Sequence, residues 1–301
     1  MPNPASDQES ISAIVTSYNS KGTIGPAIES VLAQSFKPQE IIVVDDGSSD
    51  GSKEIINSYS GEIQIAFREN GGPSKARNHG IELASESWLA FLDGDDIWHP
   101  KKLELQIEAS RQNPDLQIIA TDWSREISKL DDHIKSQRRY FAEDIAILNR
   151  FQTSTVMMKR ELARSINGFD SELDSAEDWD MWLRATKDRY SLVLGAPLVF
   201  YRDSPQGVSK DLRKLARKAD QIMLRESQSQ DLDPQLLREL RIWHQHRLII
   251  GQLLSEHPLE ALGMIPNSIR AGRPMDQIAA FRRYTVPFLM ERLKRRTKPK
   301  S

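Results

Sequence analysis

Short apolar runs alternate with helically spaced apolar residues along the first hundred positions. Four runs have the length of buried strands, at 11–18, 40–47, 62–69 and 87–96. Between them, apolar residues recur at helical spacing in 22–35, 52–60 and 73–85. Continuous apolar runs indicate buried strands, and helical spacing indicates amphipathic helices. Strands that alternate with helices predict an α/β fold, with a mostly parallel sheet flanked by helices.

The pattern changes twice beyond residue 100. The middle third is less regular and predicts a helix at 175–188 and strands at 116–123, 154–159 and 190–202. After Pro205 the pattern becomes almost wholly helical, with candidate helices at 208–229, 234–255, 257–271 and 274–296. The turn-forming residues DSPQG mark this change. We therefore expect an α/β domain in 1–204 and an all-helical region with a basic tail in 205–301.

Composition narrows the class of protein. The chain has 301 residues and 39% hydrophobic residues, and its mean hydropathy is −0.53. No apolar run approaches the roughly 18 to 20 residues that span a bilayer, and the first ten residues lack the features of a secretory signal. The absence of cysteine excludes disulfides, thiolate nucleophiles and cysteine zinc sites. A cytoplasmic protein is expected.

Charge is unevenly distributed. The formal net charge is −2, but the segment 281–301 contains eight Arg or Lys residues and one Glu. This tail also carries apolar residues, so it could lie on anionic lipid at the cytoplasmic face of a membrane. The alternative is a terminal helix docked on the domain with a frayed basic end. No motif supports nucleic-acid binding.

Acidic residues follow two of the predicted strands. FLDGDDIWHP places Asp93, Asp95 and Asp96 after one strand, and VVDDGSSDGS places Asp45 and Asp46 after another. Ligands of parallel sheets bind at the carboxyl ends of the strands, so these acids are expected to face one crevice. Asp-x-Asp pairs are common by chance, and Asp96 could merely cap a turn. The position of this stretch after a buried strand nevertheless favours a ligand role.

A hard cation is the expected partner of these carboxylates. Oxygen ligands without a Cys or His cluster favour Mg²⁺ or Mn²⁺ over zinc. Magnesium-type sites use one or two carboxylates and complete their shell with water and substrate phosphates. The expected ligand is therefore a nucleoside diphosphate. The chain has neither GxGxxG after a strand nor GxxxxGK[ST], which disfavours a nicotinamide enzyme and a P-loop NTPase.

Two further stretches carry candidate chemistry. In NGGPSKARNHG, Lys75 and Arg77 could face phosphate at a helix start, although a solvated helix face is the simpler interpretation of Lys75. In SAEDWDMWLR, Glu177 and Asp178 form a carboxylate pair, of which one could act as a base. The alternative for Asp178 is a capping box with Ser175.

These stretches, in this order, resemble the inverting glycosyltransferases of family 2, which have the GT-A fold. The resemblance covers about residues 11–201, and its motifs are IVTSYN, EIIVVDDGSSDGS, NGGPSKARNHGI, FLDGDDIWHP, STVMMKRELARSINGFD and EDWDMWLR. It implies transfer of a sugar from a nucleotide-diphosphate sugar, expected to be a UDP-sugar, to an acceptor hydroxyl. The acceptor would be a glycan or a lipid-linked sugar of cell-surface polysaccharide or glycolipid synthesis.

The resemblance also implies residue roles. Asp46 would accept a hydrogen bond from the base, while Asp45 either assists or shapes the turn. Asp93 would bind ribose, and Asp95, with Asp93, would bind Mn²⁺ or Mg²⁺ on the diphosphate. The remaining donor contacts would come from Thr16, Tyr18, Lys75 and Arg77.

Asp178 matches the catalytic base of the family, with Glu177 beside it in the acceptor site. The rival interpretations are a nucleotidyltransferase of related fold and a catalytically silent domain that binds sugar nucleotides or a partner. The helical region could shape the acceptor site, bind lipid or form a homodimer.

Overall fold

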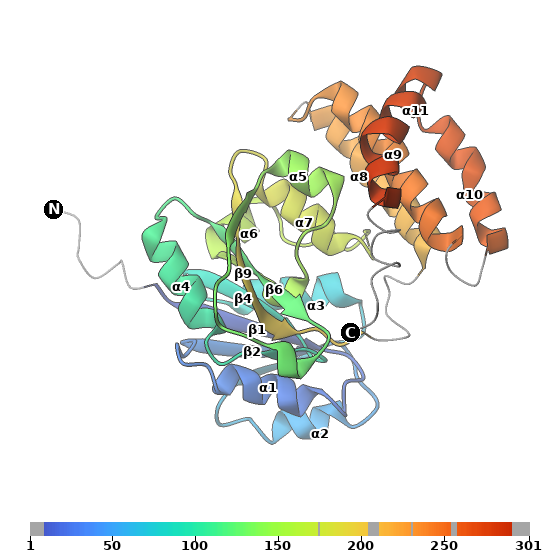
Figure 1. The fold of residues 1–301 in the computed structure, drawn as a ribbon. Coiled ribbons are helices and arrows are strands. Elements are labelled where there is room, and N and C mark those ends of the chain that lie inside the picture. Colours follow the sequence, from blue (N-terminus) through green and yellow to red (C-terminus); the bar gives the residue numbers. More distant parts are fainter. Residues whose placement is uncertain (1–8, 174, 204–210, 230, 254–257, 291–301) are drawn as a thin grey trace. The chain divides into compact units, whose positions relative to one another are not determined.

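The computed structural model describes residues 9–173, 175–203, 211–229, 231–253 and 258–290. The chain divides into two compact units, Met1–Ser204 and Pro205–Ser301. Figure 1 shows a sheet with helices on both of its faces in the first unit, and helices alone in the second.

The first half of the α/β unit has the predicted alternation of strands and helices. Its elements are β1 (Ile11–Ser17), α1 (Ile24–Leu32), β2 (Glu40–Asp45), α2 (Ser52–Asn57), β3 (Gln64–Phe67), α3 (Pro73–Leu83) and β4 (Trp88–Asp93). Its strands pair in parallel, β1 with β2 and β4, and β2 with β3. The continuous apolar runs are therefore buried strands, as their pattern predicts.

The second half of this unit is richer in short elements than the sequence predicts. It contains β5 (Ile97–Trp98), α4 (Lys102–Gln112), β6 (Ile118–Ser124), η1 (Ile127–Lys129), β7 (Gln137–Tyr140), α5 (Ala142–Ile147), η2 (Thr153–Thr155), β8 (Met157–Lys159), α6 (Arg160–Ser165), α7 (Glu177–Ala185) and β9 (Ser191–Phe200). The pattern of apolar residues does not show α4, because this helix buries Lys102 and Gln106 together with its apolar residues. Lys102 Nζ donates to Gln106 at 2.9 Å and lies 4.2 Å from the centre of the Trp98 ring.

The sheet has the order β3-β2-β1-β4-β8-β6-β9-β5, with β7 paired to β9. Strand β8 is antiparallel to both β4 and β6, whereas β6 and β9 are parallel. The carboxyl ends of β1, β2, β4, β6 and β9 therefore lie on the same side of the sheet, along the line where these strands end. This mixed, mostly parallel sheet matches the predicted fold class.

Two apolar layers cover the sheet. One face packs against α1 and α4, as seen in a cluster that includes Val15, Ile28 and Leu103. On the other face, Phe91 of β4 packs against Phe169 and against Trp182 of α7, at 5.4 and 6.4 Å between ring centres. These contacts fix α7, which begins with the candidate base, over the sheet.

The second unit is built around one long helix. Its elements are α8 (Leu212–Ser229), α9 (Pro234–Leu253), α10 (Pro258–Arg270), α11 (Pro274–Ala280) and the π-helix η4 (Phe281–Thr285). Helices α8, α10 and α11 all pack against α9. Within the described ranges, no helix combines the length and the apolar character needed to cross a bilayer. Residues 291–301, most of the basic tail, lie outside the described residues.

Candidate active site

An arginine from α3 holds the acid that ends β4. Arg77 Nη2 lies 2.8 and 3.1 Å from the two Asp93 oxygens, and its Nε lies 3.3 Å from Oδ1. Thr16, the neighbour of Asp93 across the β1–β4 pair, donates to the same carboxylate at 3.3 Å. The Asp93 side chain stays 28% exposed. It can therefore still meet a ligand at the sheet edge.

Arg77 also connects this strand end to the start of α7. Its Nη1 donates to Glu177 Oε1 at 3.0 Å, and its guanidinium lies 5.3 Å from the centre of the Phe169 ring. Arg77 is only 6% exposed. Burial alone would lower the pKa of Arg77, but the charges of Asp93 and Glu177 raise it above its ordinary value. A fixed positive charge therefore stands between the strand-end acid and the carboxylate pair.

Asp178 lies beside Glu177 with different partners. Its carboxylate accepts from Asn149 Nδ2 at 2.8 Å and from the backbone N–H of Trp179 at 2.7 Å. Burial and the charge of Glu177 raise the pKa of Asp178 to about 7, although Arg77 and Asn149 act to lower it. A carboxylate that titrates near neutral pH is suited to general base catalysis.

The capping box considered for Asp178 does not form. Helix α7 begins after Ala176, without a side-chain hydrogen bond to its cap. Ser175 instead has a φ of 79°, in the left-handed region that non-glycine residues rarely adopt. Asp178 is therefore held by Asn149, and the geometry favours the functional alternative.

The two acids after β2 have unequal surroundings. Asp46 is buried, forms an ion pair with Arg68 and accepts backbone N–H bonds from Gly71 at 3.1 Å and Gly72 at 2.7 Å. Asp45 is also buried, but only its Oδ1 has a partner, the backbone N–H of Ser48 at 2.9 Å. Asp45 Oδ2 has none within the described structure. An unpaired buried carboxylate oxygen is costly unless a ligand donates to it. The geometry thus favours Asp45 over Asp46 for a hydrogen bond to the base.

The two acids that follow Asp93 also differ. Asp96 is buried and accepts from Ser154 Oγ and from the backbone N–H of Arg202. It therefore fixes the turn after β4 to the end of β9. Asp95 is half-buried, and burial together with the charge of Asp93 raises its pKa to about 6.

A divalent cation fits Asp95 if the ion brings most of its own ligands. Among the described residues, no group of three or more His, Asp or Glu side chains is arranged to hold a metal. The described part of the chain thus offers no complete cage of side-chain ligands. Burial and the charge of Asp93 raise the pKa of Asp95, and a cation bound there would offset the repulsion between the two carboxylates. Mg²⁺ is usually bound by one or two carboxylates, and water and phosphate oxygens complete its coordination shell.

The structure leaves two predicted donor residues outside this hydrogen-bonded group. Tyr18 follows β1 and is 54% exposed, and Lys75 lies exposed on the first turn of α3. The described residues show no hydrogen bond from either side chain to the acids. Partners of the acids that were not expected from the sequence include Arg68, Asn149, Ser154 and Arg202. Asn149 precedes η2 in a segment without a motif, so no local signal could have identified it.

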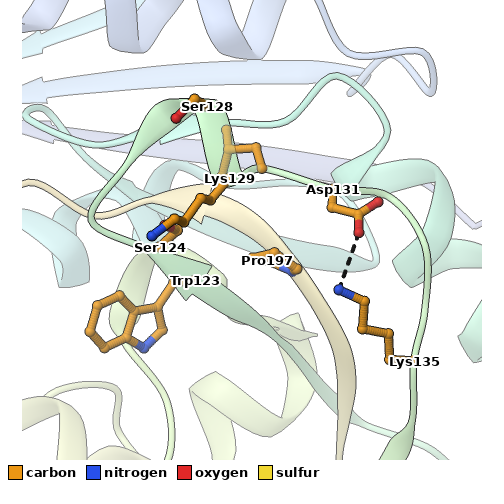
Figure 2. Close-up of a pocket in the computed structure, with 8 residues that line it drawn as sticks. Trp123, Ser124, Ser128, Lys129, Asp131, Lys135 and Pro197 are labelled. Carbon is orange, nitrogen blue, oxygen red and sulfur yellow. Dashed lines mark ion pairs between the residues drawn. The ribbon is translucent and has the colours of Figure 1, made fainter. Parts of the chain in front are cut away.

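A separate pocket of about 630 Å³ lies near the carboxyl end of β6. Figure 2 shows its lining, with the ion pair of Lys135 and Asp131 (3.4 Å) on one side and the indole of Trp123 on the other. The Trp123 ring packs against Tyr201, with 5.2 Å between ring centres. None of the candidate site residues lines this pocket.

Comparisons with known proteins identify the family of the chain. A family model described as "Glycosyl transferase family 2" matches residues 12–165. This range includes Asp45, Arg77 and Asp93, and it ends before Glu177 and Asp178.

Curated relatives extend the match. The putative teichuronic acid biosynthesis glycosyltransferase TuaG of Bacillus subtilis (strain 168) is 30% identical over 216 residues, covering 69% of this chain and 84% of TuaG. The amylovoran biosynthesis glycosyltransferase AmsB of Erwinia amylovora is 33% identical over 214 residues, covering 64% of this chain and 69% of AmsB. An uncharacterized glycosyltransferase of Rickettsia typhi is 32% identical over 184 residues, and the chain spans only 58% of its length.

Solved structures share the fold. TarS of S. aureus in complex with UDP-GlcNAc has a TM-score of 0.69 at 20% identity, over 89% of this chain and 82% of that one. The mannosyltransferase PcManGT from Pyrobaculum calidifontis, in complex with GDP-Man and Mn²⁺, has a TM-score of 0.59 at 16% identity, over 91% of this chain and 86% of that one. These likenesses confirm the predicted fold.

Proposed function

The chain belongs to glycosyltransferase family 2, and we propose that it transfers a sugar from a nucleotide-diphosphate sugar to an acceptor hydroxyl with inversion. The chemistry is assigned to the GT-A unit, residues 1–204. One observation carries the proposal: Arg77 joins Asp93, at the expected donor site, to Glu177, the neighbour of the candidate base. One buried arginine thus links the strand-end acid Asp93 to the residue next to the candidate base.

The donor site lies at the ends of β1, β2 and β4. Asp45 accepts from the base through Oδ2, while Asp46 holds the loop that starts α3. Asp93 contacts ribose, with Thr16 and Arg77 fixing its carboxylate. A UDP-sugar is the proposed donor, and the likeness to a UDP-GlcNAc complex of TarS supports this choice.

Exposed residues and the metal complete the donor site. Tyr18 lines the base pocket, and Lys75 approaches the phosphates from α3. Mn²⁺ or Mg²⁺, held by Asp95 with Asp93, would offset negative charge on the leaving diphosphate.

Asp178 is the proposed base. As the acceptor oxygen forms its bond to the anomeric carbon, Asp178 takes the hydroxyl proton. The bond from that carbon to the diphosphate oxygen breaks, and its electron pair leaves with the diphosphate. Attack from the side opposite the leaving group inverts the configuration. Asn149 positions the base through its hydrogen bond, and the charge of Glu177 helps to raise its pKa.

The proposed acceptor is a glycan or a lipid-linked sugar of polysaccharide synthesis. TuaG and AmsB, named for the biosynthesis of teichuronic acid and amylovoran, support this context. The basic tail is proposed to contact anionic lipid at the cytoplasmic face of a membrane, and the helical unit could also form a homodimer. Flotation of the full chain and a 1–280 truncation with anionic liposomes tests the lipid contact. Equal flotation would rule it out.

Replacement of the base tests the proposed function. Asp178→Asn should lower nucleoside diphosphate release from a UDP-sugar by roughly 10²- to 10⁴-fold. UDP binding, measured by calorimetry, should change little, because Asp178 does not belong to the donor site. Equal losses of release and binding would contradict the assignment of the base.

A further inference from the structure

Arg150 is an exposed arginine with an unusual environment. Its guanidinium lies 5.3 Å from the centre of the Tyr140 ring. Within the described part of the chain, no carboxylate forms an ion pair with it. By contrast, Arg138, two residues before Tyr140 on β7, is paired with Asp122. Arg150 is therefore oriented by an aromatic ring and keeps its charge uncompensated.

This arginine lies on the side of the sheet that carries the candidate base. Its neighbour Asn149 donates to Asp178 at 2.8 Å. The Tyr140 ring meets Phe151 at 6.2 Å, and Phe151 meets Trp182 of α7 at 6.3 Å. Arg150 and Tyr140 are thus connected through aromatic contacts to the helix that begins with Glu177 and Asp178.

The chemistry of the pair favours an anion. Guanidinium is planar and weakly hydrated, and its paired N–H groups match a carboxylate or a phosphate. Stacking on an aromatic face orients these groups before a ligand arrives and leaves the N–H edge available.

We infer that Arg150 binds an anionic group of the acceptor, a carboxylate or a phosphate ester, beside the hydroxyl that Asp178 deprotonates. This inference rests on the proposed function and specifies its acceptor as an acidic glycan or a sugar phosphate. Arg150 is a specificity residue here, since the reacting atoms lie at Asp178.

Arg139 provides a matched control on the same strand. Its guanidinium lies 4.6 Å from the centre of the Tyr190 ring, and it too is exposed without an acidic partner among the described residues. Its side chain points to the opposite face of β7 from Tyr140. Replacement of Arg139 therefore removes the same charge and the same kind of stacking, but away from Asp178.

Binding of simple sugars to protein saturated with UDP and Mn²⁺ tests the inference. Glucuronate, glucose 6-phosphate and glucose are titrated by calorimetry, with the donor phosphate site already filled. At least one anionic sugar should bind roughly tenfold more tightly than glucose, as expected for hydrogen bonds to a charged group. The tighter of the two anions distinguishes a carboxylate from a phosphate acceptor.

Arg150→Gln should abolish this preference, Arg150→Lys should retain part of it, and Arg139→Gln should leave it unchanged. Equal binding of all three sugars to the wild type would overturn the inference. So would a preference that survives in Arg150→Gln or is lost equally in Arg139→Gln. UDP binding, titrated first in each protein, tests the proposed function separately and should be the same in all four.

Discussion

Asn149 Nδ2 donates to Asp178 Oδ2 at 2.8 Å, across 29 residues of sequence. This bond orients the candidate base and lowers its pKa, whereas burial and the charge of Glu177 raise it. The balance of these effects leaves the pKa of Asp178 at about 7. The base can therefore exist in its ionised form at neutral pH and still accept a proton during transfer.

The pH dependence of the reaction should report this balance. Asp178 must be ionised to take a proton, so nucleotide release should fall about tenfold per pH unit below a pKa near 7. Asn149→Ala removes a bond that lowers the pKa, and the acid limb should move to higher pH. The measurement is the rate of UDP release from about pH 5 to about pH 9, a range that includes the ionisation of a general base. An acid limb at the same pH in both proteins would contradict the role of Asn149.

The raised pKa of Asp178 should also make the stability of the folded protein depend on pH. Because folding raises the pKa of Asp178, the folded state holds its proton over a window in which the unfolded chain has lost it. Stability of the wild type should therefore decrease as the pH rises from about 4 to about 7. Asp178→Asn has no carboxyl proton to lose, so it lacks this pH-dependent loss of stability. The melting temperature of Asp178→Asn minus that of the wild type should therefore be larger above this pH window than below it. A difference that does not vary with pH would argue against the shifted pKa.

Arg77 should be essential for stability as well as for activity. It is buried between Asp93 and Glu177, and removal of one member of a buried ion pair typically costs about 3–5 kcal/mol. Urea unfolding of Arg77→Met should show a loss of this order. Arg77→Met leaves Asp93 and Glu177 without their cation, and Glu177→Gln removes one of these two charges. The double variant should therefore lose less free energy of unfolding than the sum of the losses in the single variants. Strict additivity would show that Arg77 and Glu177 are not coupled.

Asp45 and Asp46 should respond differently to replacement by asparagine. Asp45→Asn can keep the bond from Ser48 and changes only the unpaired oxygen, so UDP binding should weaken while the unfolding free energy changes little. Asp46→Asn replaces an oxygen that accepts from Gly71 and Gly72, and should cost about 1–3 kcal/mol of stability. Calorimetric titration with UDP and urea unfolding measure the two effects. The reverse pattern would return the base contact to Asp46.

The strand-end acids could be predicted from sequence because their signal is local. An apolar run followed directly by Asp93 or Asp45 indicates both a buried strand and its carboxyl end. Parallel pairing then places these ends along one edge, and the register puts Thr16 beside Asp93. The alternation of strands and helices up to residue 93 was predicted for the same reason.

Long-range partners could not be predicted in this way. Arg77 contacts Glu177 across 100 residues, and neither residue carries a signal that specifies the other. Asn149 lies in a segment with no motif. Helix α4 was missed because Lys102 and Gln106 occupy its buried face, where the pattern would require apolar residues.

Thermal unfolding with a panel of UDP-sugars, with and without Mn²⁺, tests the proposed donor and metal site. At about 100 times its dissociation constant, a bound donor should add roughly 2.7 kcal/mol, a shift of several degrees for a domain of this size. We expect such a shift for at least one UDP-sugar, dependent on Mn²⁺ in the wild type and lost in Asp95→Ala. The absence of a shift with every UDP-sugar would contradict the proposed donor site. An unchanged shift in Asp95→Ala would contradict the metal role of that residue.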